Sequence, residues 1–167
     1  MDVLEAIRTR RSIRKYTDRD VPDEFIEKIL TAGIWAPSGK NNQPWRFAVV
    51  KDKKLKSEIA KQTIHTNILE NAPVIIAVFL DHNVTYDVVK DANTMGACIQ
   101  NMLLAAHALG LGAVWIAEIR NKMDEVRKLC GAPEEYELIA VVPIGFSREK
   151  EKKGRRTGLE KVVFLRK

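Results

Sequence analysis

The spacing of apolar and polar residues along the chain predicts an alternation of helices and short buried strands. Apolar side chains recur every three or four residues in several segments, which places them along one face of a helix. The helices expected from this spacing cover residues 2–9, 22–34, 53–62, 91–109 and 121–130. Apolar runs of strand length lie at 47–50, 74–80, 113–117 and 138–146. The run at 74–80 is continuous, which predicts a central strand covered on both faces.

Individual residues mark where these elements end. Pro22 fits the first position of the second helix, and Gly110 fits the left-handed position after the last turn of the longest helix. Pro143 interrupts the strand expected at 138–146. The longest helix carries small residues on several sides, so we expect it to be central and a candidate for a subunit interface. His107, on the same helix, is expected to be a core or interface histidine rather than a catalytic one.

The end of the chain departs from this pattern. An almost wholly charged run at 148–156 is followed by a strand-like apolar segment at 162–165. An apolar terminus beyond a hydrophilic arm is hard to explain on a self-contained monomer. We therefore expect this end to be buried against a second copy of the chain.

Composition limits the class of protein. The 167 residues suit a single domain, 1–167, and 46% hydrophobic with 30% charged residues is ordinary for a globular chain. The net charge of +6 is compatible with nucleic-acid binding, yet the Lys and Arg residues are scattered outside the run at 148–156. Binding of a small phosphorylated molecule accounts for the charge equally well.

The cysteines and the lengths of the apolar runs indicate the cellular location of the protein. Cys98 and Cys130 form no CxxC pair and have no histidine at metal-ligand spacing, so we expect two buried thiols in a reducing compartment and no metal site. No run reaches the roughly 18 apolar residues of a membrane helix, and the first residues lack the apolar core of a signal peptide. The expected location is the cytoplasm, with no membrane partner.

Two stretches concentrate polar chemistry. Four of the six residues from 10 to 15 are basic: Arg10, Arg11, Arg14 and Lys15. That much like charge is costly unless an anion or carboxylates offset it, and Arg presents a planar fork that suits a phosphate. A solvated, salt-bridged turn is the alternative. The second stretch, APSGKNNQPW at 36–45, is a loop rich in hydrogen-bonding groups, of a kind that either carries function or simply connects a helix to a strand.

Five motifs follow one another along the chain. They are Arg10-Arg11-Ser12-x-Arg14; Pro37-Ser38-Gly39-x-Asn41-x-Gln43-Pro44-Trp45; QNMLLAAHALGLG at 100–112; Trp115-Ile116; and Val142-Pro143-Ile144-Gly145-Phe146, followed by a basic RR-x-x-L-E stretch. In this order and spacing they resemble the nitroreductase family of FMN-dependent oxidoreductases. The resemblance covers nearly the whole chain.

The resemblance implies an α+β fold, nitroreductase-like and FMN-dependent, with a central mixed or antiparallel sheet flanked by helices. It also implies a homodimer that exchanges its C-terminal arms and binds one FMN in each of two clefts at the interface. The residues that the resemblance assigns to the cofactor are Arg10, Arg11, Ser12, Arg14, Pro37, Ser38, Gly39, Asn41, Gln43, Ile116, Ala117, Glu118, Arg155 and Arg156.

The same resemblance implies a role for each group of residues. Those near the start of the chain hold the phosphate and the pyrimidine edge of FMN, and Arg156, with Arg155 beside it, closes over the phosphate. The loop residues reach the FMN from the other subunit. A backbone N–H after the Trp-Ile pair contacts flavin N5; many family members have Gly there, whereas this chain has Ala117 and Glu118, so the contact is assigned to either of these two.

The implied reaction has two steps. NADH or NADPH stacks on the flavin and passes a hydride to N5, and an electron-poor acceptor such as a nitroaromatic, a quinone or another flavin then takes the same place. No side chain is assigned as catalytic, because the cofactor carries the chemistry. The alternatives are a specialised member of the family, a non-catalytic flavin carrier, and a basic nucleic-acid-binding module; the last predicts a colourless protein whose binding weakens steeply with salt.

Overall fold

The computed structural model describes residues 1–150 and 153–167 of the chain. Its α-helices are α1 (Val3–Thr9), α2 (Asp23–Ile34), α3 (Lys53–Ala60), α4 (Thr66–Glu70), α5 (Val88–Ala108) and α6 (Met123–Leu129). Its strands are β1 (Trp45–Val50), β2 (Val74–Asp81), β3 (Gly112–Ala113) and β4 (Tyr136–Gly145). Short 3-10 helices form η1 (Gly39–Asn41), η2 (Glu118–Lys122) and η3 (Leu159–Lys161).

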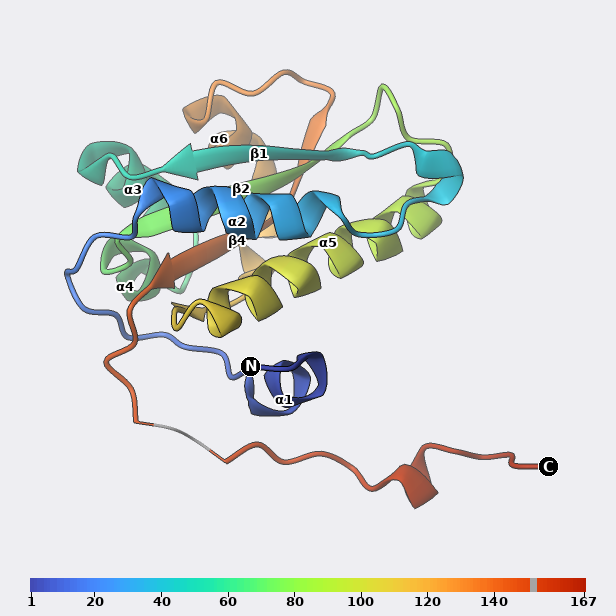
Figure 1. Cartoon of the computed structure of the whole chain (residues 1–167). Coiled ribbons are helices and arrows are strands. Elements are labelled where there is room, and N and C mark those ends of the chain that lie inside the picture. The colour runs from blue at the N-terminus through green and yellow to red at the C-terminus, as the bar shows by residue number, and fades with distance from the viewer. Residues whose placement is uncertain (151–152) are drawn as a thin grey trace.

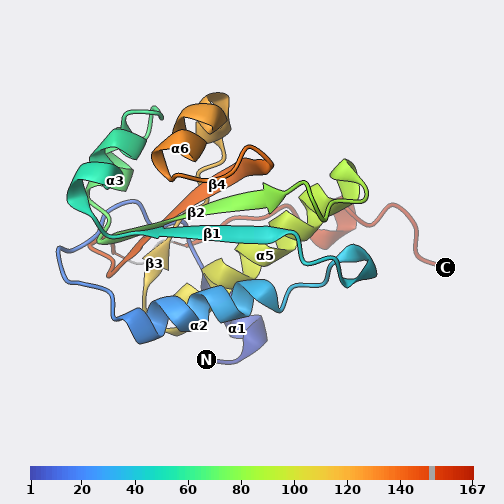
Figure 2. The same cartoon turned by 90° about the horizontal axis from the view of Figure 1, so that it is seen from above.

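The strands form one antiparallel sheet with the order β1-β2-β4-β3. Helices α2 and α5 cover one face of this sheet, and α3 and α6 cover the other (Figures 1 and 2). The predicted α+β arrangement, an antiparallel sheet flanked by helices, is therefore confirmed. The exchange of C-terminal arms between two chains stays a prediction.

The central strand explains why its apolar run is continuous. β2 lies between β1 and β4 and is buried along its whole length. Side chains from Val74 to Leu80 alternate between two hydrophobic clusters: the even-numbered residues pack with α2 and α5, and the odd-numbered residues pack with α3, α4 and α6. Both faces of β2 are thus core, as the sequence predicted.

The strand predicted at 113–117 is shorter in the structure, where β3 covers only Gly112–Ala113, and Pro143 explains the difference. β3 pairs with the end of β4, and a later bridge, in which Ile116 and Val141 exchange both backbone hydrogen bonds at 3.0 Å, continues the same register. That register places Val114 opposite Pro143, where β4 would donate its next N–H. Since proline has no N–H, the ladder is interrupted there, and a two-residue strand with one isolated bridge remains.

Three helical regions also differ from the prediction. The helix expected at 91–109 begins at Val88, because the side chain of Asp87 accepts the N–H of Lys90 and caps the first turn. The helix expected at 121–130 is divided into η2 and α6. α4 was not predicted at all, since five residues are too few to show a helical repeat.

The apolar end of the chain is not a strand, contrary to the prediction for 162–165. η3 is followed by irregular backbone, and the tail extends away from the sheet below α5 (Figure 1). All residues of 153–167 are exposed, and Phe164 is 99% exposed. A strand forms only against a neighbouring strand, and the described part of the chain offers the tail none. Its burial against a second copy stays a prediction.

The turn after α5 requires glycine. Gly110 has a φ of 76°, while a Cβ at this place would meet no atom within 4 Å, so backbone strain alone decides the effect of substitution. We expect Gly110→Ala to lower the free energy of unfolding by about 1–2 kcal/mol. Gly110→Asn should cost less, because Asn enters the left-handed region more readily. Urea unfolding of the two variants checks this, and equal losses would contradict it.

Candidate functional site

The basic turn, residues 10–15, is fixed to the rest of the fold on two sides. Ser12 forms a parallel bridge with Ala113 of β3. The carboxylate of Glu149, beyond the end of β4, accepts hydrogen bonds from the N–H groups of Arg14 and of the next residue, at 2.6 and 3.1 Å. The backbone of the turn is therefore held in place, and its basic side chains project from a defined position.

Arginines from both ends of the chain lie close enough at this turn for their charges to interact. The pKa of Arg10, at the end of α1, is lowered first by partial burial and then by the positive charges of Arg156 and Arg11. The tail contacts the turn at Gly154 as well, where an added Cβ would collide with the guanidinium of Arg11. Within residues 1–150 and 153–167, no carboxylate forms an ion pair with Arg10. The arrangement concentrates positive charge that an anion would offset.

The amide-rich loop, residues 36–45, holds a strained backbone. Lys40, Asn41 and Gln43 have φ values of 55°, 56° and 48°, a region that costs a non-glycine residue about 1–3 kcal/mol. The N–H of Gln43 donates to Ser38 Oγ at 3.2 Å, and its side-chain amide donates to the carbonyl of Asn41 at 3.3 Å. Such a conformation persists only where the surroundings fix it, which favours a functional loop over a plain connection.

Groups behind the amide-rich loop fix it to α5. Asn42 Nδ2 donates to Asp91 Oδ1 at 2.9 Å and to the carbonyl of Val84 at 3.1 Å. The second oxygen of Asp91 accepts the N–H of Tyr86 at 3.1 Å. Gly39 packs against the Tyr86 ring so closely that any Cβ would overlap the phenol oxygen. The loop therefore rests on the N-terminal end of α5 and on the segment that precedes it.

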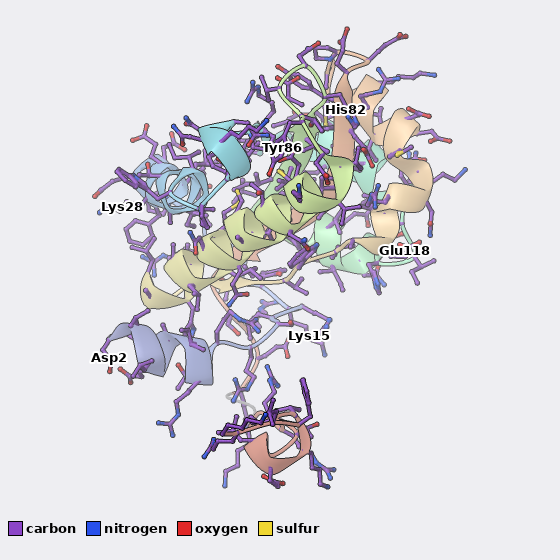
Figure 3. The ribbon with its side chains drawn as sticks, turned by 90° about the vertical axis from the view of Figure 1, so that its right-hand side faces the viewer. Asp2, Lys15, Lys28, His82, Tyr86 and Glu118 are labelled. Atoms are coloured by element: carbon purple, nitrogen blue, oxygen red, sulfur yellow. The ribbon has the colours of Figure 1, made fainter. Side chains whose placement is uncertain are left out.

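The basic turn and the amide-rich loop lie at opposite ends of α5. Figure 3 shows Tyr86 beside one end of this helix and Asp2, on the helix α1 that leads to the basic turn, below the other. Thr9, next to the basic turn, contacts His107 near the C-terminal end, with 2.8 Å between Oγ1 and Nε2, whereas the loop is bonded to Asp91 in the first turn. At about 1.5 Å per residue these two anchors are separated by about 24 Å along the helix axis. One chain alone does not bring the two groups together.

The segment predicted to reach flavin N5 follows β3. Ile116 is buried, Ala117 is exposed, and Glu118 opens η2. The pKa of Glu118 is lowered mainly by the hydrogen bond from the hydroxyl of Thr63 and, to a smaller extent, by the amide of Asn121. The carboxylate of Glu118 is therefore engaged by the loop after α3, and the contact with N5, if made here, belongs to the backbone.

The predicted cofactor residues fall into three groups. The first, around the basic turn, is Arg10, Arg11, Ser12, Arg14 and Arg156; the second, in the amide-rich loop, is Pro37, Ser38, Gly39, Asn41 and Gln43; the third, after β3, is Ile116, Ala117 and Glu118. The bridge between Ser12 and Ala113 joins the first group to the third. Arg155 is exposed in the tail, where its carbonyl accepts the Arg156 guanidinium at 2.8 Å.

Sequence reasoning missed the residues that hold these groups in place. Glu149 stands in a charged run and looks like any solvated carboxylate until its bonds to the basic turn are seen. Asp91 and Asn42 are 49 positions apart, and no local pattern links them. One signal was present in the sequence: a carboxylate in the first turn of a helix whose inner face is otherwise apolar apart from Thr94.

The thiols and the acidic side chains suggest no further chemistry. Cys98 is buried and Cys130 is half-buried, and neither forms a disulfide. Burial raises the pKa of Cys98 to about 12 and that of Cys130 to about 11, so both stay protonated at neutral pH. In the described part of the chain no three His, Cys, Asp or Glu residues gather as metal ligands. Nor does that part contain a helix with the length and apolar character needed to span a bilayer.

Comparison with known proteins identifies relatives over most of the chain. A protein of Methanothermobacter thermautotrophicus, named as a candidate NADH dehydrogenase/NAD(P)H nitroreductase, is 40% identical over 151 residues, which cover 89% of this chain and 79% of that protein. A similar protein of Archaeoglobus fulgidus, with the same name, is 38% identical over 156 residues, which cover 90% of this chain and 88% of that protein.

Solved structures give the same result. A candidate nitroreductase from Desulfovibrio desulfuricans, in complex with FMN, is 44% identical and has a TM-score of 0.94 over 100% of this chain and 98% of that one. The NADPH:FMN oxidoreductase of Vibrio harveyi, complexed with NAD+, is 26% identical and has a TM-score of 0.88 over 98% of this chain and 76% of that one. The family model described as "Nitroreductase family" matches residues 7–67 and 60–146. The predicted resemblance is confirmed, and the chain belongs to the nitroreductase family.

Proposed function

We propose that the protein is an FMN-dependent oxidoreductase that takes a hydride from NADH or NADPH and passes it to an electron-poor acceptor, such as a nitroaromatic, a quinone or another flavin. The observation that carries the proposal is the contact between the two ends of the chain at the basic turn, where Gly154 of the tail packs on Arg11 and the charges of Arg10, Arg11 and Arg156 act on one another. The FMN bound to the Desulfovibrio relative and the NAD+ bound to the Vibrio relative support the choice of cofactor and co-substrate.

The donors at the basic turn fit the phosphate of FMN. Guanidinium groups bind phosphate oxygens through paired, charge-assisted hydrogen bonds. The pKa of Arg10 is lowered first by partial burial and then by the like charges of Arg156 and Arg11, so the three positive charges oppose one another in the flavin-free protein. A phosphate dianion between them would replace this repulsion by attraction. The tail would then close over the phosphate, as the contact between Gly154 and Arg11 supports.

The flavin ring would extend from the basic turn towards β3. Reduced flavin carries negative charge near N1 and O2, and a cation such as Arg14, with the hydroxyl of Ser12, would stabilise it. Because Ser12 is bridged to Ala113, the segment after β3 is close, and a backbone N–H of Ala117 or Glu118 would serve N5. The carboxylate of Glu118 is bonded to Thr63, so only its backbone is assigned this role.

The distance between the two halves of the site supports a homodimer. The anchors of the amide-rich loop and of the basic turn lie about 24 Å apart along α5, so one chain places these two groups of residues at opposite ends of the helix. The loop of a second chain would supply Pro37, Ser38, Gly39, Asn41 and Gln43. The surface for such a contact exists, because the tail and the outer face of α1 expose large apolar side chains: Val3, Leu4, Ile7, Leu159, Val162 and Phe164.

Bound FMN would supply the redox chemistry, since its ring accepts a hydride at N5 and returns it to a second substrate. The side chains of this protein bind and orient. Arg10 and Arg156 hold the phosphate, and Arg14 holds the edge of the ring where charge develops. The side-chain amides of Asn41 and Gln43 offer both donors and acceptors to a flavin whose edge has both. No side chain needs to act as an acid or base when the hydride arrives.

Colour is the simplest test of this function. We expect the purified protein to be yellow or to become yellow on reconstitution with FMN, to bleach anaerobically with NADH or NADPH, and to regain colour when a quinone or nitroaromatic is added. Free FMN at the same concentration is the control. A yellow protein that neither reductant bleaches would be a flavin carrier, and a colourless protein that does not take up FMN would contradict the proposal.

A further inference from the structure

We infer that Asp91 is a positioning residue for the cofactor: its buried carboxylate fixes the shape of the amide-rich loop without touching the flavin. Asp91 lies outside all five motifs that carry the family resemblance. The inference rests on the proposed FMN site, to which the loop belongs.

Asp91 has the contacts expected of such a residue. It is 0% exposed, and its two oxygens are bonded to different segments: Oδ1 accepts from Asn42 Nδ2 and Oδ2 accepts from the N–H of Tyr86. Burying a carboxyl group is costly, and a well-packed apolar residue at the same place is often neutral or stabilising by comparison. The carboxyl group is therefore better explained by what it orients than by stability.

Asn42 transmits this contact to the cofactor residues. It stands between Asn41 and Gln43, both of which have positive φ. Its Nδ2 makes two hydrogen bonds, to Asp91 and Val84, whereas its buried Oδ1 has no partner among the described residues. The amide nitrogen is thus the anchor of the side chain. Without Asp91, the neighbouring residues would lose the contact that holds them in a strained conformation.

The second bond of Asp91 places the aromatic ring behind the loop. Tyr86, labelled in Figure 3, packs directly against Gly39. The centre of its ring lies 5.0 Å from Lys40 Nζ and 5.5 Å from Lys90 Nζ. One carboxylate therefore sets both the loop and the side chain on which the loop rests. Both bonds must form together for the loop to keep the observed shape.

Exchanging the two partners tests the inference. In Asp91→Asn only one of the two acceptor oxygens remains, so, with the Asn42 amide in its observed orientation, the new amide N–H₂ faces either Asn42 Nδ2 or the N–H of Tyr86. In Asn42→Asp two carboxylates face each other. The double variant restores a donor and an acceptor, and the new amide oxygen can still accept the N–H of Tyr86. A charge-assisted hydrogen bond is strong enough that each single variant should release FMN roughly tenfold faster, with the double variant within about threefold of the wild type. Rescue is incomplete because Val84 loses its donor.

Stopped-flow release of FMN from the reconstituted protein measures the rate, and the absorption spectrum of bound FMN reports the loop's contact with the ring. Asp87→Ala is the matched control, because it removes the cap of α5 but no bond to the loop. It should lower the melting temperature and keep the rate of release. If it speeds release as much as Asp91→Asn does, general loosening of α5 explains the effect and the inference is overturned.

The wild-type protein distinguishes failure of the proposed function from failure of the inference about Asp91. If the wild type binds no FMN, the proposed function fails. If the wild type binds FMN while the single variants release it at the wild-type rate, or while the double variant is no better than the singles, the inference alone fails. Should Asp91→Asn not fold, Asn42→Ala removes the same bond from the loop side, leaves the bond to Tyr86 in place, and should also speed release roughly tenfold.

Discussion

In Arg10→Ala the affinity for FMN is expected to fall by at least a hundredfold. A charge-assisted hydrogen bond contributes about 1.5–3 kcal/mol, and each 1.4 kcal/mol is a factor of ten, so the loss of a two-bond fork exceeds that figure. The effect should be this large because Arg10 is partly buried and meets Arg156 from the far end of the chain. A titration of the flavin-free protein with FMN, followed by fluorescence, measures it.

The same substitution should not weaken the fold. The pKa of Arg10 is lowered by burial and by like charges, so at every pH below its unfolded-state value the charged side chain destabilises the flavin-free protein. Removing the charge is therefore expected to leave the free energy of unfolding unchanged or to raise it. The affinity for FMN should therefore fall while the free energy of unfolding does not. This result would show that the variant has lost a contact with the ligand and has kept its structure.

Two controls make the result specific. Arg8→Ala removes the same charge from an exposed position in the last turn of α1, and it should change FMN affinity little at physiological salt. Arg10→Lys keeps the charge but loses the fork, and it should bind FMN with intermediate affinity. If Arg8→Ala were as damaging as Arg10→Ala, the protein would recognise net charge and not a phosphate held by this turn.

Deletion of residues 158–167 is expected to abolish both the dimer and FMN binding, although Arg155 and Arg156 remain. The deleted segment includes Phe164 and Leu165, which are 99% and 58% exposed in one chain. Burying such a side chain contributes about 1.5–3 kcal/mol, and a symmetric dimer buries each twice; about 6 kcal/mol is roughly 10⁴-fold in the dimer dissociation constant. FMN should be lost with the dimer, because the second half of its site comes from the partner.

Sedimentation equilibrium, with the flavin content measured in the same samples, checks this expectation. Deletion of residues 166–167 is the matched control: it shortens the tail and keeps its apolar side chains, so the protein should stay dimeric and yellow. A protein lacking 158–167 that remained a dimer with bound FMN would show that the arms are not what joins the chains. The homodimer proposed from the separation of the two half-sites would then need another interface.

The parts of the fold that were predicted are those with a local cause. β2 could be predicted from its continuous apolar run, since a strand buried on both faces is apolar nearly throughout. The short β3 could not, because the residue that limits it is Pro143, whose effect on Val114 depends on the register of another strand. The start of α5 was predicted three residues too late, because its first turn depends on the cap supplied by Asp87.

The candidate site, like the fold, has parts that could be predicted from the sequence and parts that could not. Clustered charge at Arg10 and Arg11 left an anion site and a salt-bridged turn open. The approach of Arg156 followed only from the family resemblance, since nothing near residue 156 predicts where the tail lies. The hydrogen-bonding side chains of the amide-rich loop could be recognised in the sequence. The left-handed backbone of the loop could not be predicted, because Lys and Gln rarely adopt positive φ. Asp91 was unpredictable for a related reason: its role is defined by a partner from a distant segment.

The length of α5 has a consequence for the pair of sites. Under the proposed arrangement, the two ends of this helix serve different flavins, so each α5 is a rigid connection between one catalytic centre and the other. Adding one residue to it would rotate its ends by about 100° and move them about 1.5 Å apart, and both centres would be misaligned although no ligand contact had been altered. Such a helix tolerates changes in side chains more readily than changes in residue number.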